Sequence, residues 1–385
     1  MNKYAYIGPD NIISPLGFGT DLNFSGILSG RTALATVHPG YSKDPFCASL
    51  FDETIIDDIF EPLGNPLKFT RLEKISILAI SSVLKRSGLD LSDPRTLLIY
   101  ATTKGNINLL EPDASSEIAE NRVYLPVFSK LLGEFFRCAK EPVVVSNACI
   151  SGLLALVIAQ RMIRAGLYDH IVVAGGDIVS EFTVAGFRSF NALSDEPCRP
   201  YDLARKGINL GEASAAVLLT LDKSLAGENP VIMTAGASAN DANHISGPSR
   251  TGAGLLQALE DVLKETKILN PGFISAHGTA TEFNDEMESI AFTRAGLSAV
   301  PVHSLKGYYG HTLGAAGLME SILGIHSLKT GRLIASAGYK DKGVSGDIQV
   351  IRQTDQKLLN SFIKTASGFG GCNAAAVFER EERLL

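Results

Sequence analysis

Residues 143–166 read VVVSNACISGLLALVIAQRMIRAG: a short apolar run, a small turn that contains Cys149, and a long segment with an apolar face. This order predicts a buried strand, a loop, and a helix that ends near Gly166. The stretch 300–335 repeats the plan, with an apolar run before Gly310-His311, a helical pattern over 313–329 and a further apolar run over 332–335. We therefore predict that one strand–loop–helix–strand unit occurs twice in this chain.

Further apolar runs surround these two stretches and alternate with helical patterns, at 96–100, 171–175 and 215–219. Such alternation predicts an α/β architecture with buried strands and covering helices. Turn-forming residues over 221–230 place a boundary between an N-terminal half, 1–225, and a C-terminal half, 226–385. The repeat would place Cys149 and His311 at equivalent points of the two halves, so we expect one site that both halves share.

Composition narrows the class of protein. The chain has 385 residues, of which 45% are hydrophobic and 20% charged, as is usual for a globular enzyme. A net charge of −6 gives no overall attraction to nucleic acid or to anionic membranes. The first residues lead directly into a strand pattern and the apolar runs are too short to cross a bilayer, so we expect no membrane insertion and a cytoplasmic protein. Five scattered cysteines without a CxxC pair indicate reduced thiols.

Three side chains offer the chemistry of thiol-based acyl transfer. Cys149 would lie at the start of a helix, where the helix dipole favours a thiolate. His277 and His311 follow strand patterns beside glycines, where an imidazole can donate to a developing oxyanion. A single cysteine between strand and helix is more often a buried apolar residue, but the two histidine motifs favour a nucleophile.

A metal site is not expected. The sequence contains no HExxH motif and no close His–Cys set, and the acidic residues just after His277 suit a solvated helix start, namely Glu282, Asp285, Glu286 and Glu288.

The order of these motifs resembles the β-ketoacyl synthases of the thiolase superfamily, of the elongating Cys-His-His type. Similar motifs extend over nearly the whole chain, with IISPLG at 12–17, CRPYD at 198–202, Lys306 before the second histidine motif, and GFGGCNA at 368–374. The resemblance implies a thiolase-like α/β fold, in which two duplicated βαβαβ halves form five layers in the order αβαβα.

The resemblance also implies an activity, the decarboxylative Claisen condensation of an acyl thioester with malonyl-acyl carrier protein to give 3-oxoacyl-acyl carrier protein. Cys149 would accept the acyl group from the carrier's phosphopantetheine arm, while His277 and His311 would hold the malonyl thioester. Lys306, with Glu320 as its ionic partner, would orient the histidine site. The backbone N–H groups of Cys149 and Phe369 would form an oxyanion hole, and Phe369 would gate the acyl pocket.

Binding residues follow from the same resemblance. It implies contacts to substrate or pantetheine from Thr279, Thr281, Phe187 and Gly370, and carrier-protein docking by Lys68, Arg71 and Lys74. No redox cofactor is expected, because decarboxylation itself supplies the carbanion. The partners would be acyl carrier protein and a second subunit, in a homodimer or in a heterodimer with a related chain.

Several positions depart from the family pattern. Ser146, Ile150 and Asn191 replace usual residues, and the region 105–142 is short. These differences could change the acyl pocket and the carrier preference. The pathway could therefore be fatty-acid elongation or a specialised polyketide or aryl-polyene synthesis. Two alternatives to the synthase remain. One is a chain-length-factor-like partner subunit, although such subunits usually lack the nucleophilic cysteine. The other is a thiolase or coenzyme A-dependent synthase, for which Cys372 would be the second cysteine.

Overall fold

The computed structural model describes residues 4–381 apart from 39–43, 113–116, 242–246, 267 and 269. Its main sheet runs in the order β14-β12-β11-β16-β17-β10-β1-β9-β7-β5-β6, with β2 (Gly17–Phe18) paired to β1. The first half of the chain contributes β1 (Ala5–Ser14), β5 (Thr96–Ala101), β6 (Val143–Val145), β7 (His170–Asp177) and β9 (Ala213–Thr220). The second half contributes β10 (Val231–Asn240), β11 (Phe273–Ser275), β12 (Pro301–His303), β14 (Gln349–Val350), β16 (Ser361–Gly368) and β17 (Cys372–Arg380).

The two halves of the sheet have the same topology. In the first half β6, β5 and β7 are parallel neighbours, and β9 and β1 follow as antiparallel strands. In the second half β12, β11 and β16 are parallel, and β17 and β10 follow as antiparallel strands. The duplication predicted from the sequence is therefore present. The division between residues 225 and 226 falls in the connection between β9 and β10.

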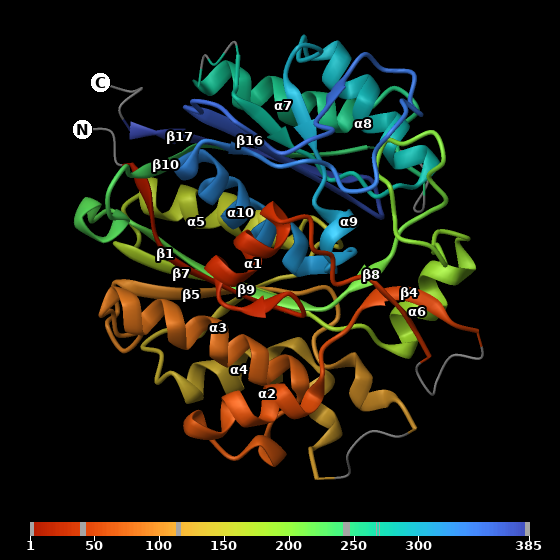
Figure 1. The fold of residues 1–385 in the computed structure, drawn as a ribbon. Coiled ribbons are helices and arrows are strands. Elements are labelled where there is room, and N and C mark those ends of the chain that lie inside the picture. The colour runs from red at the N-terminus through yellow and green to blue at the C-terminus, as the bar shows by residue number, and fades with distance from the viewer. Residues whose placement is uncertain are drawn as a thin grey trace.

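The elements stack in five layers, and Figure 1 shows the sheets edge-on. Helices α2 (Glu53–Phe60), α3 (Arg71–Ser87) and α4 (Leu125–Phe135) cover the outer face of the first half-sheet. Helices α7 (Ala253–Thr266) and α8 (Glu282–Arg294) cover the outer face of the second. Between the sheets lie α5 (Ser151–Arg164) and α10 (Ala316–Thr330), with α1 (Thr20–Leu28) and α9 (Lys306–Tyr309) beside them. This is the predicted αβαβα order.

The central helices lie between two sheets and are buried almost all round. Twelve of the fifteen residues of α10 are buried, as are nine of the fourteen of α5. The helices come closest where each has glycine as its second residue. A Cβ at Gly152 would lie 2.8 Å from the Leu318 nitrogen, and a Cβ at Gly317 would lie 2.8 Å from the Leu153 nitrogen. These reciprocal contacts place a pseudo-twofold axis between the helix starts.

Two details of the predicted repeat are wrong. The run 332–335 forms only a short strand, β13 (Arg332–Leu333), which pairs with β15 (Asp355–Gln356) outside the main sheet. The strand equivalent to β7 is instead β16. With Gly152 and Gly317 as equivalent positions, Cys149 corresponds to Gly314 and not to His311, because the second half has a longer connection between strand and helix.

The remaining elements lie near the site that the two halves share. Strands β3 (Ala35–Val37), β4 (Phe46–Ser49) and β8 (Leu210–Gly211) form a small sheet, and α6 (Glu181–Ser189) lies close to it. None of the helices in the described part of the chain is both long and apolar enough to cross a membrane.

Candidate active site

Cys149 lies in a tight turn between β6 and α5. Ala148 has a left-handed backbone conformation, with φ of 45°, which an alanine adopts only under strain. Ser151 braces this turn, since its hydroxyl accepts from the Asn147 N–H at 2.8 Å and donates to the Ala148 carbonyl at 2.6 Å. The turn places the nearly buried thiol at the junction of the two halves.

The two predicted histidines meet this thiol in space. One residue separates His277 from the end of β11, and His311 lies between α9 and α10. Their ring centroids are 5.1 Å apart with the planes at 83°. One ring nitrogen of each and the Cys149 sulfur all lie within 4.8 Å of one another. Residues far apart in sequence thus form a Cys–His–His cluster, as predicted.

This cluster is also a close His–Cys set that the sequence did not reveal. Three such groups at this spacing would suit a soft metal ion as well as acyl transfer. The expectation of no metal therefore stays a prediction.

Burial decides the protonation states of the cluster. Burial and, to a smaller extent, the nearby Cys372 raise the pKa of Cys149 to about 12, against the opposite effect of Lys306. The expectation that the start of α5 favours the thiolate stays a prediction. Burial, with Lys306 next in importance, holds the pKa of His277 and of His311 well below the usual range. A neutral thiol therefore faces two neutral imidazoles.

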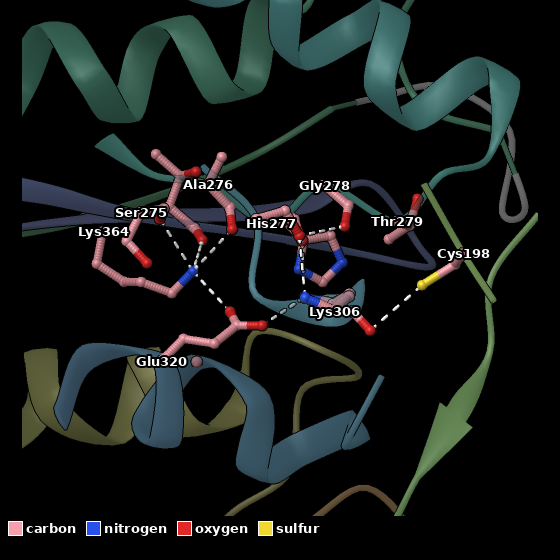
Figure 2. A network of polar contacts seen from close by, with 12 residues as sticks. Cys198, Ser275, Ala276, His277, Gly278, Thr279, Lys306, Glu320 and Lys364 are labelled. Carbon is pink, nitrogen blue, oxygen red and sulfur yellow. Dashed lines mark hydrogen bonds and ion pairs between the residues drawn. The ribbon is translucent and has the colours of Figure 1, made fainter. Parts of the chain in front are cut away.

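A buried polar network contacts the backbone of His277 (Figure 2). Lys306 donates to the His277 carbonyl at 2.7 Å and pairs with Glu320, also at 2.7 Å. The ion pair between Lys306 and Glu320 is thus present as predicted. Cys198 belongs to the same network, since its thiol donates to the Lys306 carbonyl at 3.2 Å.

Sequence reasoning missed a second lysine in this network. Lys364, on β16, is fully buried, and its Nζ lies 2.7 Å from the second carboxylate oxygen of Glu320 (Figure 2). A signal was available, because Lys364 is the one charged residue in the run SFIKTASG.

Two carboxylates predicted to be solvated are buried instead. Glu288 accepts from the N–H groups of His277 and Gly278, at 2.9 and 2.6 Å. Asp285 accepts from the Thr279 N–H at 2.9 Å, and burial raises the pKa of this carboxyl to about 6. These carboxylates of α8 therefore hold the loop after His277 in place. The spacing of the acidic residues in the sequence did not distinguish this arrangement from an exposed helix end.

A cavity of about 490 Å³ opens onto the cluster and is lined by Cys149 and both histidines. Thr279 and Thr281 line it too, with their hydroxyls 2.8 Å apart. The cavity is large enough for a pantetheine arm or part of an acyl chain.

Aromatic side chains form one wall of this cavity. Phe369 packs against Phe187 and Phe190, with ring centroids 5.5 and 5.1 Å apart, and Phe187 meets His311 edge-on. Phe369 is 37% exposed, so it lies at the opening, where the predicted gate would be. Gly370 is exposed and does not line the cavity, whereas Gly368 and Gly371 do. Its predicted substrate contact is not supported by its position.

The three predicted docking cations are not equivalent. Arg71 pairs with Glu53 and with the buried Glu212, and Lys74 is mostly buried and pairs with Asp57. Of the three, only Lys68 has an exposed side chain. Arg71 and Lys74 hold α3 to its neighbours, so carrier docking stays a prediction that rests mainly on Lys68.

The departures from the family pattern have different locations. Ile150 is buried in the core between the sheets and does not line the cavity, whereas Asn191 does. Ser146 is exposed, with its hydroxyl 3.4 Å from the Thr103 carbonyl. The described residues of the short region 105–142, which leave out 113–116, form α4 and two 3₁₀ turns beside the first half-sheet.

The chain matches two models of one protein family. The model of the β-ketoacyl synthase N-terminal domain matches residues 126–224, and that of the C-terminal domain matches 230–340, together more than half of the chain. The chain belongs to the β-ketoacyl synthase family. The family predicted from the motifs is thereby confirmed.

Relatives of this β-ketoacyl synthase cover its whole length. It is 28% identical to the tetracenomycin polyketide synthase ketoacyl synthase alpha subunit of Streptomyces glaucescens, over 98% of this chain and 97% of the relative. It is 26% identical to 3-oxoacyl-(acyl-carrier-protein) synthase 2 of Vibrio harveyi, over 96% of each. Both names are those of acyl-transferring condensing enzymes, as the predicted enzyme class requires.

Solved structures agree on the fold. The structure of the ketosynthase ApeO in complex with its chain length factor ApeC, from Xenorhabdus doucetiae, superposes with a TM-score of 0.84 at 23% identity, over 98% of each chain. A β-ketoacyl synthase from Burkholderia phymatum superposes with a TM-score of 0.83 at 22% identity. The predicted thiolase-like fold is confirmed.

Proposed function

We propose that this β-ketoacyl synthase condenses an acyl group held on Cys149 with a malonyl unit delivered by acyl carrier protein. The observation that carries the proposal is the convergence of the Cys149 sulfur with one nitrogen from each of His277 and His311, within 4.8 Å, at a cavity of about 490 Å³. The reaction releases carbon dioxide and gives a 3-oxoacyl thioester on the carrier.

The first step transfers the acyl group to the enzyme. Because burial raises the pKa of Cys149 to about 12, the thiol must lose its proton as it attacks. A neutral imidazole of the cluster accepts this proton, the sulfur–carbonyl bond forms, and the carrier's pantetheine thiol leaves with a proton. Backbone N–H groups of Cys149 and Phe369 would stabilise the oxyanion of the intermediate.

The second step makes the carbon–carbon bond. Neutral imidazoles of His277 and His311 donate hydrogen bonds to the thioester carbonyl of the malonyl group, which stabilises the enolate formed as carbon dioxide leaves. The enolate carbon attacks the acyl carbonyl on Cys149, and the sulfur leaves as a thiolate and takes up one proton from solvent. Imidazolium would also stabilise an enolate, but burial beside Lys306 keeps both rings neutral.

The partners and setting form part of the proposal. Some structural neighbours are ketosynthases bound to a chain length factor, and one is bound to an acyl-carrier protein. These likenesses support acyl carrier protein as the donor, and a dimer with either an identical or a related subunit. We place the reaction in the cytoplasm, with no redox cofactor.

Intact-protein mass spectrometry tests the proposal. Incubation with a panel of acyl-carrier proteins should add one acyl mass to the wild type and none to Cys149→Ala, and the panel would rank chain lengths. An adduct in both proteins would place the acyl group elsewhere. No adduct with any donor, including after addition of a candidate partner chain, would favour a chain-length-factor-like subunit.

A further inference from the structure

Glu320 is shared by two buried lysines that come from different elements. Lys306 lies on α9 and Lys364 on β16, and each Nζ is 2.7 Å from a different oxygen of the carboxylate. Neither lysine side chain is exposed, and that of Glu320 is 3% exposed. Because one carboxylate faces two ammonium groups, the cluster holds an excess positive charge inside the protein, which costs free energy unless other groups solvate it.

Backbone carbonyls provide that solvation for Lys364. Its Nζ lies 3.0 Å from the Ser275 oxygen, 3.2 Å from that of Ala276 and 2.7 Å from that of Thr365. Burial lowers the pKa of Lys364, while Glu320 opposes this. Four oxygens around one nitrogen suit an ammonium, which has three donors and no lone pair.

Two of the three carbonyls that Lys364 contacts belong to the residues directly before His277, Ser275 and Ala276. Lys306 donates to the carbonyl of His277 itself, at 2.7 Å. The two lysines therefore hold three consecutive peptide units at the end of β11 (Figure 2). The backbone that carries the His277 ring therefore cannot shift without breaking buried hydrogen bonds.

Comparison with the other half shows that the fold does not need a lysine here. The fourth residue of β7 is Val173, and the fourth residue of the equivalent β16 is Lys364. Val173 packs in the apolar core between the sheets. An apolar residue therefore suits this strand position in the first half, where no histidine follows the neighbouring strand.

We infer that Lys364 is a positioning residue for decarboxylation, which together with Lys306 fixes the backbone that carries His277. This inference rests on the proposed function. Lys364 does not line the cavity, so it acts through other residues.

The experiment measures malonyl-acyl carrier protein decarboxylation and Cys149 acylation separately in wild type and Lys364→Met. Decarboxylation should fall by about 10–100-fold, as expected for a misplaced ring. Acylation of Cys149 should change by less than about threefold, because the thiol is held by another turn. Lys357→Met, which removes an exposed lysine, is the matched control and should change neither rate.

Other outcomes overturn the inference or the proposed function separately. An unchanged rate of decarboxylation in a folded Lys364→Met protein overturns the inference, as does a parallel loss of both rates together with a loss of thermal stability. Failure of the wild type to decarboxylate overturns the proposed function instead. In that case, the NMR chemical shifts of labelled histidines, assigned with His277→Ala, still report whether the environment of the His277 ring changes in Lys364→Met. If Lys364→Met does not fold, Lys364→Gln, which keeps only part of the donors for the carbonyls, carries the same comparison of the two rates.

Discussion

The two halves of this β-ketoacyl synthase share their strand order but use the same junction differently. In the first half, residues 146–150 connect β6 to α5 in a strained turn that presents Cys149. In the second, the longer connection 304–315 contains α9 and presents Lys306 and His311. One scaffold can therefore present a nucleophile from a short turn and proton-transferring groups from a long loop. This is possible because the sheets and the central helices fix the two ends of each connection.

The largest expected effect is that of Cys149→Ala. Condensation should fall by at least about 10³-fold, because Cys149 is the one cysteine among the described residues that line the cavity. Decarboxylation of malonyl-acyl carrier protein should persist, since the second half still holds both imidazoles. Release of carbon dioxide and formation of the 3-oxoacyl product, followed in parallel, check this. Loss of both activities in a folded variant would contradict the division of labour between the halves.

The reverse separation is expected from His277→Ala. Decarboxylation should fall by about 10²–10⁴-fold, because a donor to the enolate is lost. The acyl adduct on Cys149 should still form, with His311 able to accept the thiol proton. Mass spectrometry and carbon dioxide release check the two steps. If His277→Ala blocked acylation as strongly as decarboxylation, the two halves would not act as separate units.

The symmetry of the central helices can be tested through their glycines. Gly152→Ala and Gly317→Ala should each lower the free energy of unfolding by about 1–3 kcal/mol, because the new Cβ would meet backbone atoms of the other helix within 2.9 Å. Urea unfolding measures both.

The control for these variants is Gly186→Ala on α6, where a Cβ would meet no atom within 4 Å. It should be neutral or stabilise the protein by up to about 1 kcal/mol. Central-helix variants as stable as this control would mean that the helices can move apart freely.

The smallest effect is expected for Cys372→Ser, which tests the thiolase alternative. Burial raises the pKa of Cys372 to about 11, and its sulfur lies 3.4 Å from the Phe369 carbonyl. We expect condensation to stay within about threefold of the wild type, because the histidines supply the proton chemistry. A loss comparable to that of Cys149→Ala would show that Cys372 acts in catalysis.

The sequence by itself determined the family, the repeated unit and the three side chains that meet at the candidate site. Apolar runs separated by small residues report strands and helices, and the motifs around Cys149, His277 and His311 are local patterns in the chain. The pairing of Lys306 with Glu320 also followed from the motifs.

Tertiary structure alone decided the rest. It buried Asp285 and Glu288 behind the site, brought Lys364 to Glu320 and engaged Arg71 and Lys74 in ion pairs. It also set the neutral state of the cluster. These properties depend on which groups meet across the interior and how much water they lose, and neither quantity is encoded in the spacing of residues along one segment.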